Sequence, residues 1–258
     1  DPGWPWLIFD HDQIELRLVA AECKDPTMLE ALGKGWDLHI MACCAMFKLP
    51  MPPVLKDPIH APENLDWRTI HRWLGCNHEA DVCGKDDIRR VFSKRYGHRQ
   101  SYGGTAKKAG SIPGAAVLGL TSKDLVQMAY ARAAMFPRLI AWQNEVAETG
   151  SKSGETRTWA GRRRRYLSRG TTYTRGEMLD HPMQAGVQDI ENMIFLAIAD
   201  HFETDSLFKF GSGDSQTWAF REPRYEEAKV KVREIAQPTI TIAGTPMYFP
   251  AAFKERTA

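Results

Sequence analysis

The chain has 258 residues, and its proportions of 43% hydrophobic and 26% charged residues exclude a disordered, collagen-like or membrane-embedded protein. Its 34 Lys and Arg residues nearly balance 32 Asp and Glu residues, so the formal net charge is only +2 and any surface for nucleic acid must be a local patch. This length predicts one large domain or two small ones.

The cysteines and the apolar runs indicate a compartment. Five cysteines are an odd number and too sparse for a disulfide framework, which favours free thiols in a reducing compartment. No run approaches the roughly 18 apolar residues that span a membrane, and the segment from Asp1 to Trp4 is not typical of a signal peptide. We therefore expect an intracellular, cytoplasmic protein, and the missing initiator Met indicates an internal fragment.

The first part of the chain predicts one strand followed by helices. The apolar run Trp6–Phe9 is typical of a buried strand, and Asp10 stands at its C-terminal end. Helical spacing follows from Gln13 to Leu32, stops at Gly33 and resumes after Asp37. Prolines then predict a loop between Leu49 and Pro62: Pro50, Pro52, Pro53, Pro58 and Pro62.

The middle of the chain is mainly helical in pattern. A basic helix is predicted from Asp86 to Tyr102, because acidic residues suit a helix N-terminus and Gly103-Gly104 stops the pattern. A long helical stretch from Thr121 to Glu148 contains Pro137, where we expect a kink or a break. The segment Gly150–Gly154 is typical of a polar linker.

The last part mixes strands and helices. Thr156–Leu167 predicts a strand or hairpin with a basic tip, the run Arg162–Arg165, and Pro182–Phe202 predicts a strongly apolar helix. Three further elements are expected: a strand at Ser206–Phe210, a helix at Tyr225–Ile235, and a hairpin that joins Thr239–Ile242 to Met247–Phe249.

Two segments carry residue types suited to phosphate chemistry. Asp10 at a strand end, with Glu15 and Arg17 on the next helix, can hold a metal and a charged substrate together. On the basic helix a cation or a ring recurs every fourth residue, on one face: Arg90, Lys94, His98 and Tyr102. Cations neutralise phosphates and a ring can stack on a base, so this face suits a nucleoside triphosphate. Taken singly, the two segments also fit a capping carboxylate and a solvated basic helix.

Taken together, these segments resemble the family A DNA polymerases, specifically their phage-type members. The segment Asp10–Arg17 is similar to the family's motif A, and Arg90, Lys94 and Tyr102-Gly103 are similar to motif B. Between them, Gly35-x-Asp37-Leu38-His39 matches a further short motif. Softer matches are Phe136-Pro137-x-Leu139, Gly161-Arg162-Arg163 and His181-Pro182-Met183-Gln184. The resemblance covers nearly the whole chain, but only the second half of a polymerase module.

The resemblance implies a template-directed DNA polymerase that uses two Mg²⁺ ions. Asp10 would bind both ions, with the His11 carbonyl as a candidate backbone ligand. Two divalent ions about 3.5–4 Å apart clamp the attacking and leaving oxygens, so a second carboxylate is needed.

The second carboxylate is expected in motif C, which in the family is a His-Asp pair between two adjacent strands. The best candidate is Asp205, although the His is missing and the helix ending at Phe202 leaves little chain for a preceding strand. Asp200 is a rival ligand if Met193–Ala199 forms a strand instead.

The resemblance also implies contacts with deoxynucleoside triphosphates and primer-template DNA. Glu15, helped by Tyr102, would block a sugar 2′-hydroxyl. His39, Arg90 and Lys94 would contact the triphosphate, and Lys94 is a candidate proton donor to the pyrophosphate leaving group. His98 stands on the same face, where the family carries Phe or Tyr. DNA contacts are expected from Arg17, Arg162, Arg163 and Gln184.

A further set of residue types would suit tetrahedral zinc: His71, Cys76, His78 and Cys83. Because their spacing lacks a Cys-x-x-Cys knuckle, surface or half-buried positions are favoured over a metal site.

We therefore expect an α+β fold, a polymerase palm sheet that carries Asp10 and Asp205 with a helical fingers subdomain inserted. The expected divisions are residues 1–17 for the first part of the palm, 18–150 for the fingers and 151–258 for the second part of the palm. A separate chain would supply the thumb and exonuclease, in a bacterial or phage-infected host cytoplasm. The alternatives are an inactive or split-gene fragment that binds nucleic acid or nucleotides, and a single-subunit RNA polymerase, which Glu15 and Tyr102 disfavour.

Overall fold

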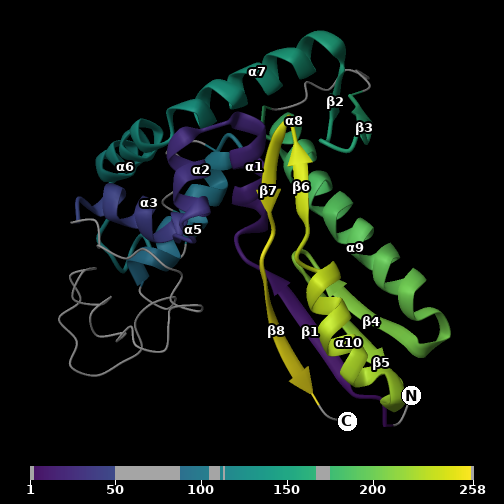
Figure 1. The fold of residues 1–258 in the computed structure, drawn as a ribbon. Helices are drawn as coiled ribbons and strands as arrows, with labels where there is room; N and C mark the ends of the chain where they lie inside the picture. The colour runs from purple at the N-terminus through teal and green to yellow at the C-terminus, as the bar shows by residue number, and fades with distance from the viewer. Residues whose placement is uncertain (1–2, 50–87, 105–110, 113, 167–174, 257–258) are drawn as a thin grey trace, which may run out of the picture. The chain divides into compact units, whose positions relative to one another are not determined.

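The computed structural model describes residues 3–49, 88–104, 111–112, 114–166 and 175–256 (Figure 1). The chain divides into two compact units. The first, called the sheet unit below, comprises Asp1–Glu22, Glu155–Arg165 and Asp180–Ala258. The second, called the helical unit, comprises Cys23–Gly154 and Tyr166–Leu179.

A four-stranded antiparallel sheet forms the centre of the sheet unit. Its strand order is β4-β5-β1-β8, with β1 at Trp6–His11, β4 at Ser206–Ser212, β5 at Ser215–Phe220 and β8 at Ala251–Arg256. Burial alternates along β1, so that Leu7, Phe9 and His11 are buried whereas Asp10 is exposed. Directly paired residues share a face of a sheet, so Phe9 and its partner Gln216 lie on the buried face, and Asp10 and its partner Ser215 on the other.

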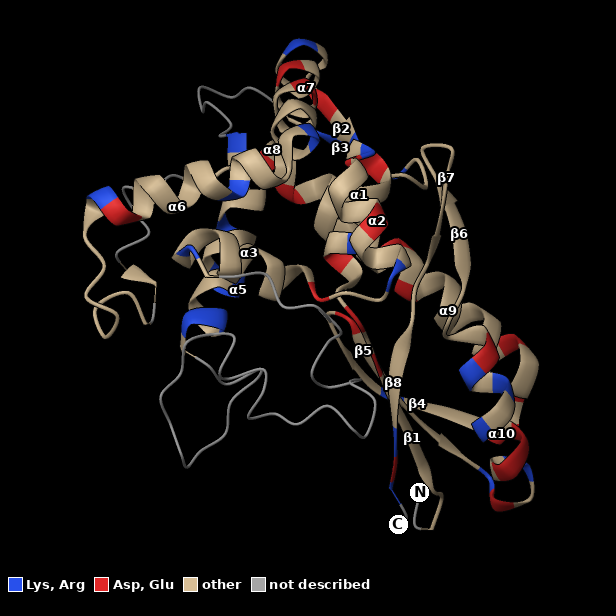
Figure 2. Ribbon diagram, turned by 60° about the vertical axis from the view of Figure 1, so that its left-hand side comes forward, with Lys and Arg blue, Asp and Glu red and all other residues tan. Residues whose placement is uncertain are grey.

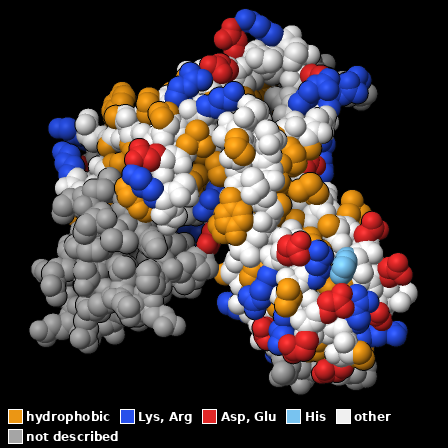
Figure 3. All heavy atoms as spheres, viewed as in Figure 1, with side chains coloured by type: hydrophobic (Ala, Val, Ile, Leu, Met, Phe, Trp, Pro, Cys, Tyr) orange, Lys and Arg blue, Asp and Glu red, His pale blue; other side chains and the backbone are white. Residues whose placement is uncertain are grey.

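Two helices cover the buried face of this sheet, α9 (Gly186–Phe202) and α10 (Glu222–Ile235). Phe195 of α9 packs on Trp218 with ring centroids 5.1 Å apart, and Phe202 packs on Phe220 at 5.0 Å. A π-helical turn, His181–Ala185, leads into α9. Charges of both signs are intermingled over α10, as expected for a solvated helix face (Figures 2 and 3).

The rest of the sheet unit consists of α1 and two hairpins. The helix α1 (Ile14–Cys23) follows β1, one hairpin joins β2 (Glu155–Arg157) to β3 (Arg163–Arg165), and the other joins β6 (Thr239–Ile242) to β7 (Thr245–Tyr248). Glycine is required where α9 begins, because a Cβ on Gly186 would lie 2.7 Å from the Leu18 side chain of α1. The Trp159 indole donates to the Gly186 carbonyl at 2.9 Å, which ties the first hairpin to the same place.

The helical unit is built from α2 (Pro26–Gly33), α3 (Leu38–Phe47), α5 (Ile88–Ser101), α6 (Ser122–Met135), α7 (Pro137–Ser153) and most of α8 (Arg175–Asp180). Asp25 and Asp37 cap α2 and α3, since each carboxylate accepts hydrogen bonds from two backbone N–H groups of the first turn. Buried Tyr96 of α5 donates its hydroxyl to the Leu125 carbonyl of α6 at 2.6 Å.

The predicted α+β fold class is confirmed, as is the break at Pro137. The helix α6 ends at Met135 and α7 begins at Pro137, because proline has no N–H to donate and suits the first helical position. The linker predicted at Gly150–Gly154 is wrong, since α7 continues to Ser153 and only Gly154, with φ of +69°, ends it.

Some elements were not foreseen from the sequence, and some predictions are not covered. The pattern missed β5, β8 and α8. The segment Tyr166–Leu179 was expected with the palm but lies in the helical unit, where the Tyr166 hydroxyl donates to the Glu177 carbonyl. The predicted loop beyond Leu49 and the zinc candidates His71, Cys76, His78 and Cys83 lie outside the described residues. No helix in the described parts of the chain is both long enough and apolar enough to cross a membrane.

Candidate functional site

Two exposed aspartates occupy neighbouring backbone positions at one end of the sheet. Asp10 pairs with Ser215 at the end of β1, and Asp214 immediately precedes Ser215 in the turn between β4 and β5. The backbone N–H of His11 donates to the Asp214 carbonyl at 2.9 Å, so the turn is joined directly to β1. We call this end of the sheet, with Asp10 and Asp214, the carboxylate end.

The local sequence explains why Asp214 occupies that turn. Gly213 and Asp214 form a two-residue connection between β4 and β5, and Gly213 has φ of +60°, which glycine adopts without strain. The Ser215 hydroxyl donates across the turn to the Ser212 carbonyl at 3.2 Å. Sequence analysis missed Asp214, although Gly-Asp between two strand-like segments is a recognisable hairpin signal.

The expectation that Asp205 is the second metal ligand is wrong, because Asp205 lies at the opposite end of the sheet. Ser206 pairs with Phe220, whose neighbour Ala219 pairs with Trp6 at the start of β1. Asp10 is four residues further along β1, or about 13 Å at 3.3 Å per residue, too far for shared ligation of ions about 3.5–4 Å apart.

Arginines surround Asp205 instead. Its carboxylate lies 3.5 Å from Arg221 and 3.3 Å from Arg224. The rival ligand Asp200 required a strand at Met193–Ala199, but these residues belong to α9, so that alternative is also wrong.

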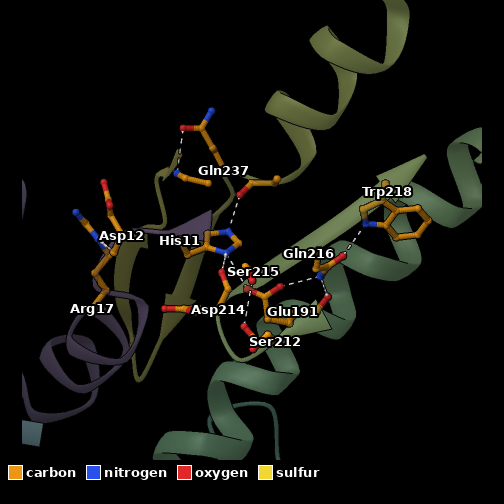
Figure 4. Close-up of polar contacts among 12 residues, drawn as sticks. His11, Asp12, Arg17, Glu191, Ser212, Asp214, Ser215, Gln216, Trp218 and Gln237 are labelled. Atoms are coloured by element: carbon orange, nitrogen blue, oxygen red, sulfur yellow. Dashed lines mark hydrogen bonds and ion pairs between the residues drawn. The ribbon is translucent and has the colours of Figure 1, made fainter. Parts of the chain in front are cut away.

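His11, which follows Asp10, is buried with an acidic partner (Figure 4). Its Nδ1 lies 2.7 Å from Glu191 Oε1 and 3.3 Å from the Asp214 carbonyl, and its Nε2 lies 2.7 Å from the Ala236 carbonyl. Burial opposes the charged imidazolium, but the contact with Glu191 outweighs it and raises the pKa of His11 above 6.5. His11 was expected to contribute its carbonyl; its side chain and Glu191 were not foreseen.

Glu15 and Gln184, which the sequence placed on nucleotide and DNA respectively, are brought together. The Gln184 amide, in the π-helical turn, donates to Glu15 Oε1 on the first turn of α1 at 2.8 Å. Both side chains reach solvent at least in part.

Arg17 is buried, which does not suit its expected contact with DNA. It is only 5% exposed, its Nε donates to the Asp12 carbonyl at 2.9 Å, and its Nη1 donates to the Tyr248 carbonyl at 3.1 Å. Burial lowers the pKa of Arg17 below its ordinary value. The Arg17 guanidinium thus links α1 to β7 by a hydrogen bond.

The hairpin of β2 and β3 carries the arginine run. Arg162 forms an ion pair with Asp189 of α9, and Arg163 lies 3.7 Å from Glu155 across the hairpin. About half of each side chain is exposed, so both can still reach a phosphate. The Thr156 hydroxyl lies 3.0 Å from His181 Nδ1, which ties this hairpin to the π-helical turn that holds Gln184.

Within the helical unit, three of the expected nucleotide ligands gather around Asp37. Arg90 Nη2 donates to Asp37 Oδ2 at 2.5 Å, and the rings of His39 and His98 stack with centroids 5.3 Å apart. Burial, with the neighbouring cations, lowers the pKa of His39 to about 3, so this ring is neutral. Burial alone would raise the pKa of Asp37, but the charge of Arg90 outweighs burial and holds that pKa below 3.8.

The other two residues of the predicted face follow along α5. Lys94, one turn beyond Arg90, is exposed, and Tyr102 at the end of the helix is partly exposed. Arg90 itself is only 5% exposed and already paired, so Lys94 presents the more accessible cation.

The comparisons with known proteins concern the fold. No protein-family model and no curated protein matches the sequence. The structure is similar to a solved structure of the POL domain of Pol1 from M. smegmatis in complex with DNA primer-template and dNTP. The TM-score is 0.72 at 18% sequence identity, and the match covers 99% of this chain and 40% of that chain. The fold is therefore similar to that of part of a DNA polymerase domain. This agrees with the predicted α+β fold of a palm sheet with inserted fingers.

Proposed function

We propose that this chain carries the nucleotidyl-transfer site of a template-directed DNA polymerase, which adds deoxynucleotides to a primer 3′-hydroxyl. The observation that carries the proposal is the placement of Asp10, at the end of β1, beside the β4–β5 turn that holds Asp214, on a fold shared with a polymerase domain. In this reaction the primer 3′-oxygen forms a bond to the α-phosphorus, the bond to pyrophosphate breaks, and the hydroxyl proton is released.

The donor set at the carboxylate end fits divalent cations. Asp10 and Asp214 offer carboxylate oxygens, the ligands that Mg²⁺ prefers, and the His11 carbonyl remains a candidate third ligand. The described residues hold no cluster of three or more metal-binding side chains, so water and substrate phosphates would complete the coordination. Two Mg²⁺ ions bound there would neutralise charge on the attacking and leaving oxygens.

The remaining residues of the sheet unit would position the nucleic acid and select the sugar. We assign DNA-backbone contacts to Arg162 and Arg163, and a primer-template contact to Gln184, which is exposed. Glu15, held by Gln184, would exclude a 2′-hydroxyl. Arg17 is left out of this set because its guanidinium is buried.

Residues of the helical unit would bind the triphosphate. Exposed Lys94 would neutralise phosphate charge and is the candidate proton donor to pyrophosphate. Arg90, buried beside Asp37, would act mainly by holding α5 against α3, with neutral His39 and the His98 ring stacked on it as neighbours of the phosphates.

Primer extension with matched aspartate variants tests the proposal. Extension of a labelled primer by deoxynucleotides and Mg²⁺ is measured for the wild type, Asp10→Asn, Asp214→Asn and Asp205→Asn, with and without a fragment that carries a family A thumb. We expect Asp10→Asn and Asp214→Asn to lower the rate by roughly 10²–10³-fold, because charge stabilisation at the reacting oxygens is lost. Asp205→Asn serves as the matched control and should extend at the wild-type rate.

Other outcomes would assign a different function. DNA or nucleotide binding without extension, with or without the thumb fragment, would favour a non-catalytic binding subunit. Ribonucleotide incorporation at the rate of deoxynucleotides would favour an RNA polymerase. Loss of extension in Asp205→Asn but not in Asp214→Asn would overturn the assignment of the second carboxylate.

A further inference from the structure

Directly behind the carboxylate end lies a buried polar network (Figure 4). Its members are the ring of His11, the carboxylate of Glu191 and the amide of Gln216, which are 3%, 3% and 4% exposed. They come from β1, α9 and β5, three elements that meet under the turn holding Asp214. Buried polar groups are costly unless they are satisfied, so such a network indicates a positional requirement.

The ring of His11 faces oxygen atoms on both sides. Nδ1 lies against the Glu191 carboxylate and the Asp214 carbonyl, and Nε2 lies against the Ala236 carbonyl. A ring placed among oxygen acceptors serves as a donor to them, which links it to each of the segments that carry these oxygens. The ring thus holds three separate segments: α9, the β4–β5 turn and the residue that follows α10.

Glu191 is itself held from the other side. The Gln216 amide nitrogen donates to Glu191 Oε2 at 2.7 Å and to the Glu191 carbonyl at 2.8 Å. The Trp218 indole donates to Gln216 Oε1 at 2.9 Å, which fixes the orientation of the amide. The donors of Gln216 and Trp218 thus hold Glu191 directly and through the amide, so the carboxylate has little freedom to move.

The turn receives little apolar support on the α9 side. A hollow of about 320 Å³ lies between α9 and the β4–β5 hairpin, and its lining includes Gly211, Ser212, Gly213 and Ser215. Because these residues are small and border open space, side-chain packing does not fix the turn from that side. The polar contacts to His11 therefore add to the pairing of β5 with β1 in fixing the turn.

We propose that the His11–Glu191 pair is a positioning device that holds Asp214 beside Asp10. The catalytic purpose of this placement rests on the proposed function. The contacts that hold the turn lie within the sheet unit and do not depend on that function. Neither side chain touches the nucleotide; the pair acts through the backbone of the turn. Supports behind metal-binding side chains are typically needed for the full affinity of the metal site.

Glu191→Gln tests the proposal with the smallest change of shape, since it removes only the charge. The His11 amide, which donates to the Asp214 carbonyl, reports on opening of the turn by hydrogen exchange. We expect its exchange, and that of the amides at 213–215, to become roughly tenfold faster in Glu191→Gln, because a charged contact is lost.

The control variant is Tyr225→Phe. It removes the hydrogen bond from the Tyr225 hydroxyl to the Trp6 carbonyl, at 3.2 Å, which lies at the other end of the same strand. Exchange at His11 should keep its wild-type rate in Tyr225→Phe. A change of similar size in both variants would mean general destabilisation of the sheet unit and would overturn the proposal.

A second measurement separates positioning from a purely structural role. Mn²⁺, used as a paramagnetic probe, is titrated by electron paramagnetic resonance into the wild type, Asp10→Asn and Glu191→Gln. We expect Glu191→Gln to weaken Mn²⁺ binding by about 10-fold and to lower kcat for extension, with KM for the deoxynucleotide within about 2-fold of wild type.

The outcomes distinguish this proposal from the proposed function. Unchanged exchange at His11 in Glu191→Gln overturns the positioning role, whether or not the chain extends primers. Faster exchange in a protein whose wild type neither binds Mn²⁺ nor extends primers supports the positioning role and contradicts the polymerase. Faster exchange with Mn²⁺ binding and kcat unchanged shows that the pair supports only the fold, and overturns the proposal.

Discussion

His11 of the sheet unit and His39 of the helical unit are 3% and 7% exposed, yet their surroundings favour opposite charge states. His11 contacts the Glu191 carboxylate and two backbone carbonyls, and its pKa is raised. His39 is buried near the cations Arg90 and Lys94 and stacks on His98, and its pKa is lowered to about 3. The pKa of the same side chain is thus raised in one unit and lowered in the other.

The difference shows that the neighbours of a buried ring, rather than burial itself, decide its charge. Burial lowers the pKa of both histidines. In the sheet unit an acid partner reverses that effect, whereas in the helical unit Asp37 is already paired with Arg90. The raised pKa of His11 suits a place beside carboxylates, and a neutral His39 avoids adding charge to a cationic cluster.

The largest expected effect on stability comes from removing the ring of His11 in the sheet unit. His11→Leu leaves the Glu191 carboxylate buried without its partner, which should lower the free energy of unfolding by about 3–5 kcal/mol. The loss is measured by urea unfolding and by hydrogen exchange of the amides in β1 and β5. The double variant His11→Leu with Glu191→Leu should regain most of it, because an apolar pair replaces the uncompensated charge. Equal losses in the single and double variants would contradict this.

In the helical unit, Asp37→Asn should cost less. The amide oxygen can still cap α3 by accepting from the backbone N–H groups of His39 and Ile40. The amide nitrogen cannot accept from Arg90, so the charged hydrogen bond to Arg90 is lost. We expect a loss of about 1.5–3 kcal/mol, the usual range for a hydrogen bond to a charged group. Thermal and urea unfolding with hydrogen exchange in α3 and α5 would detect it. Asp25→Asn, in the residue that caps α2, is the control. An equal loss of stability in Asp25→Asn would point to a general capping effect instead of the pair with Arg90.

Acidification should weaken the helical unit through His39. Between its unfolded pKa of 6.5 and its folded pKa of about 3, the unfolded chain binds a proton at this ring and the folded chain does not. Lower pH therefore favours unfolding over this window, by up to about 1.4 kcal/mol per pH unit. Urea unfolding between about pH 7 and 5 measures the slope, which His39→Asn should reduce. An unchanged slope in His39→Asn would show that this ring is already protonated in the fold.

The smallest effect is expected at an exposed pair of the same residue types. His201, near the end of α9, lies 3.2 Å from Glu227 of α10, and both side chains are more than one-third exposed. Because exposed ion pairs contribute little, His201→Gln should leave the urea midpoint of the sheet unit at its wild-type value. A loss comparable with that of His11→Leu would remove the distinction between buried and exposed pairs.

Much of the fold could be predicted from local sequence patterns. The strand before Asp10, the break at Pro137 and the helix that ends at Phe202 follow from apolar spacing and proline chemistry within a few residues. The alignment of Arg90, Lys94 and His98 on α5 is equally local, because a helix brings every fourth residue to one face. The linker predicted at Gly150–Gly154 failed because α7 continues through Gly150, which is buried there despite its low helix propensity.

The second carboxylate could not be chosen by local pattern. Asp205 and Asp214 both flank the strand β4, and only the pairing of β5 with β1 shows which of them lies beside Asp10. A hairpin reverses the chain, so the two ends of one strand reach opposite ends of the sheet. The missing element was β5, and without it the turn at Gly213-Asp214 had no recognised second strand.

The sequence by itself determined the class of fold, the strand-end position of Asp10 and the cationic face of α5, because each depends on neighbours within a turn or a strand. Only the tertiary structure decided that Asp214 is the aspartate adjacent to Asp10, that Arg17 and Arg90 are buried, and that His11 lies against Glu191. His11 and Asp214 are separated by 203 residues. Contacts over such separations are fixed by strand pairing and helix packing, which leave no local periodic signal in the chain.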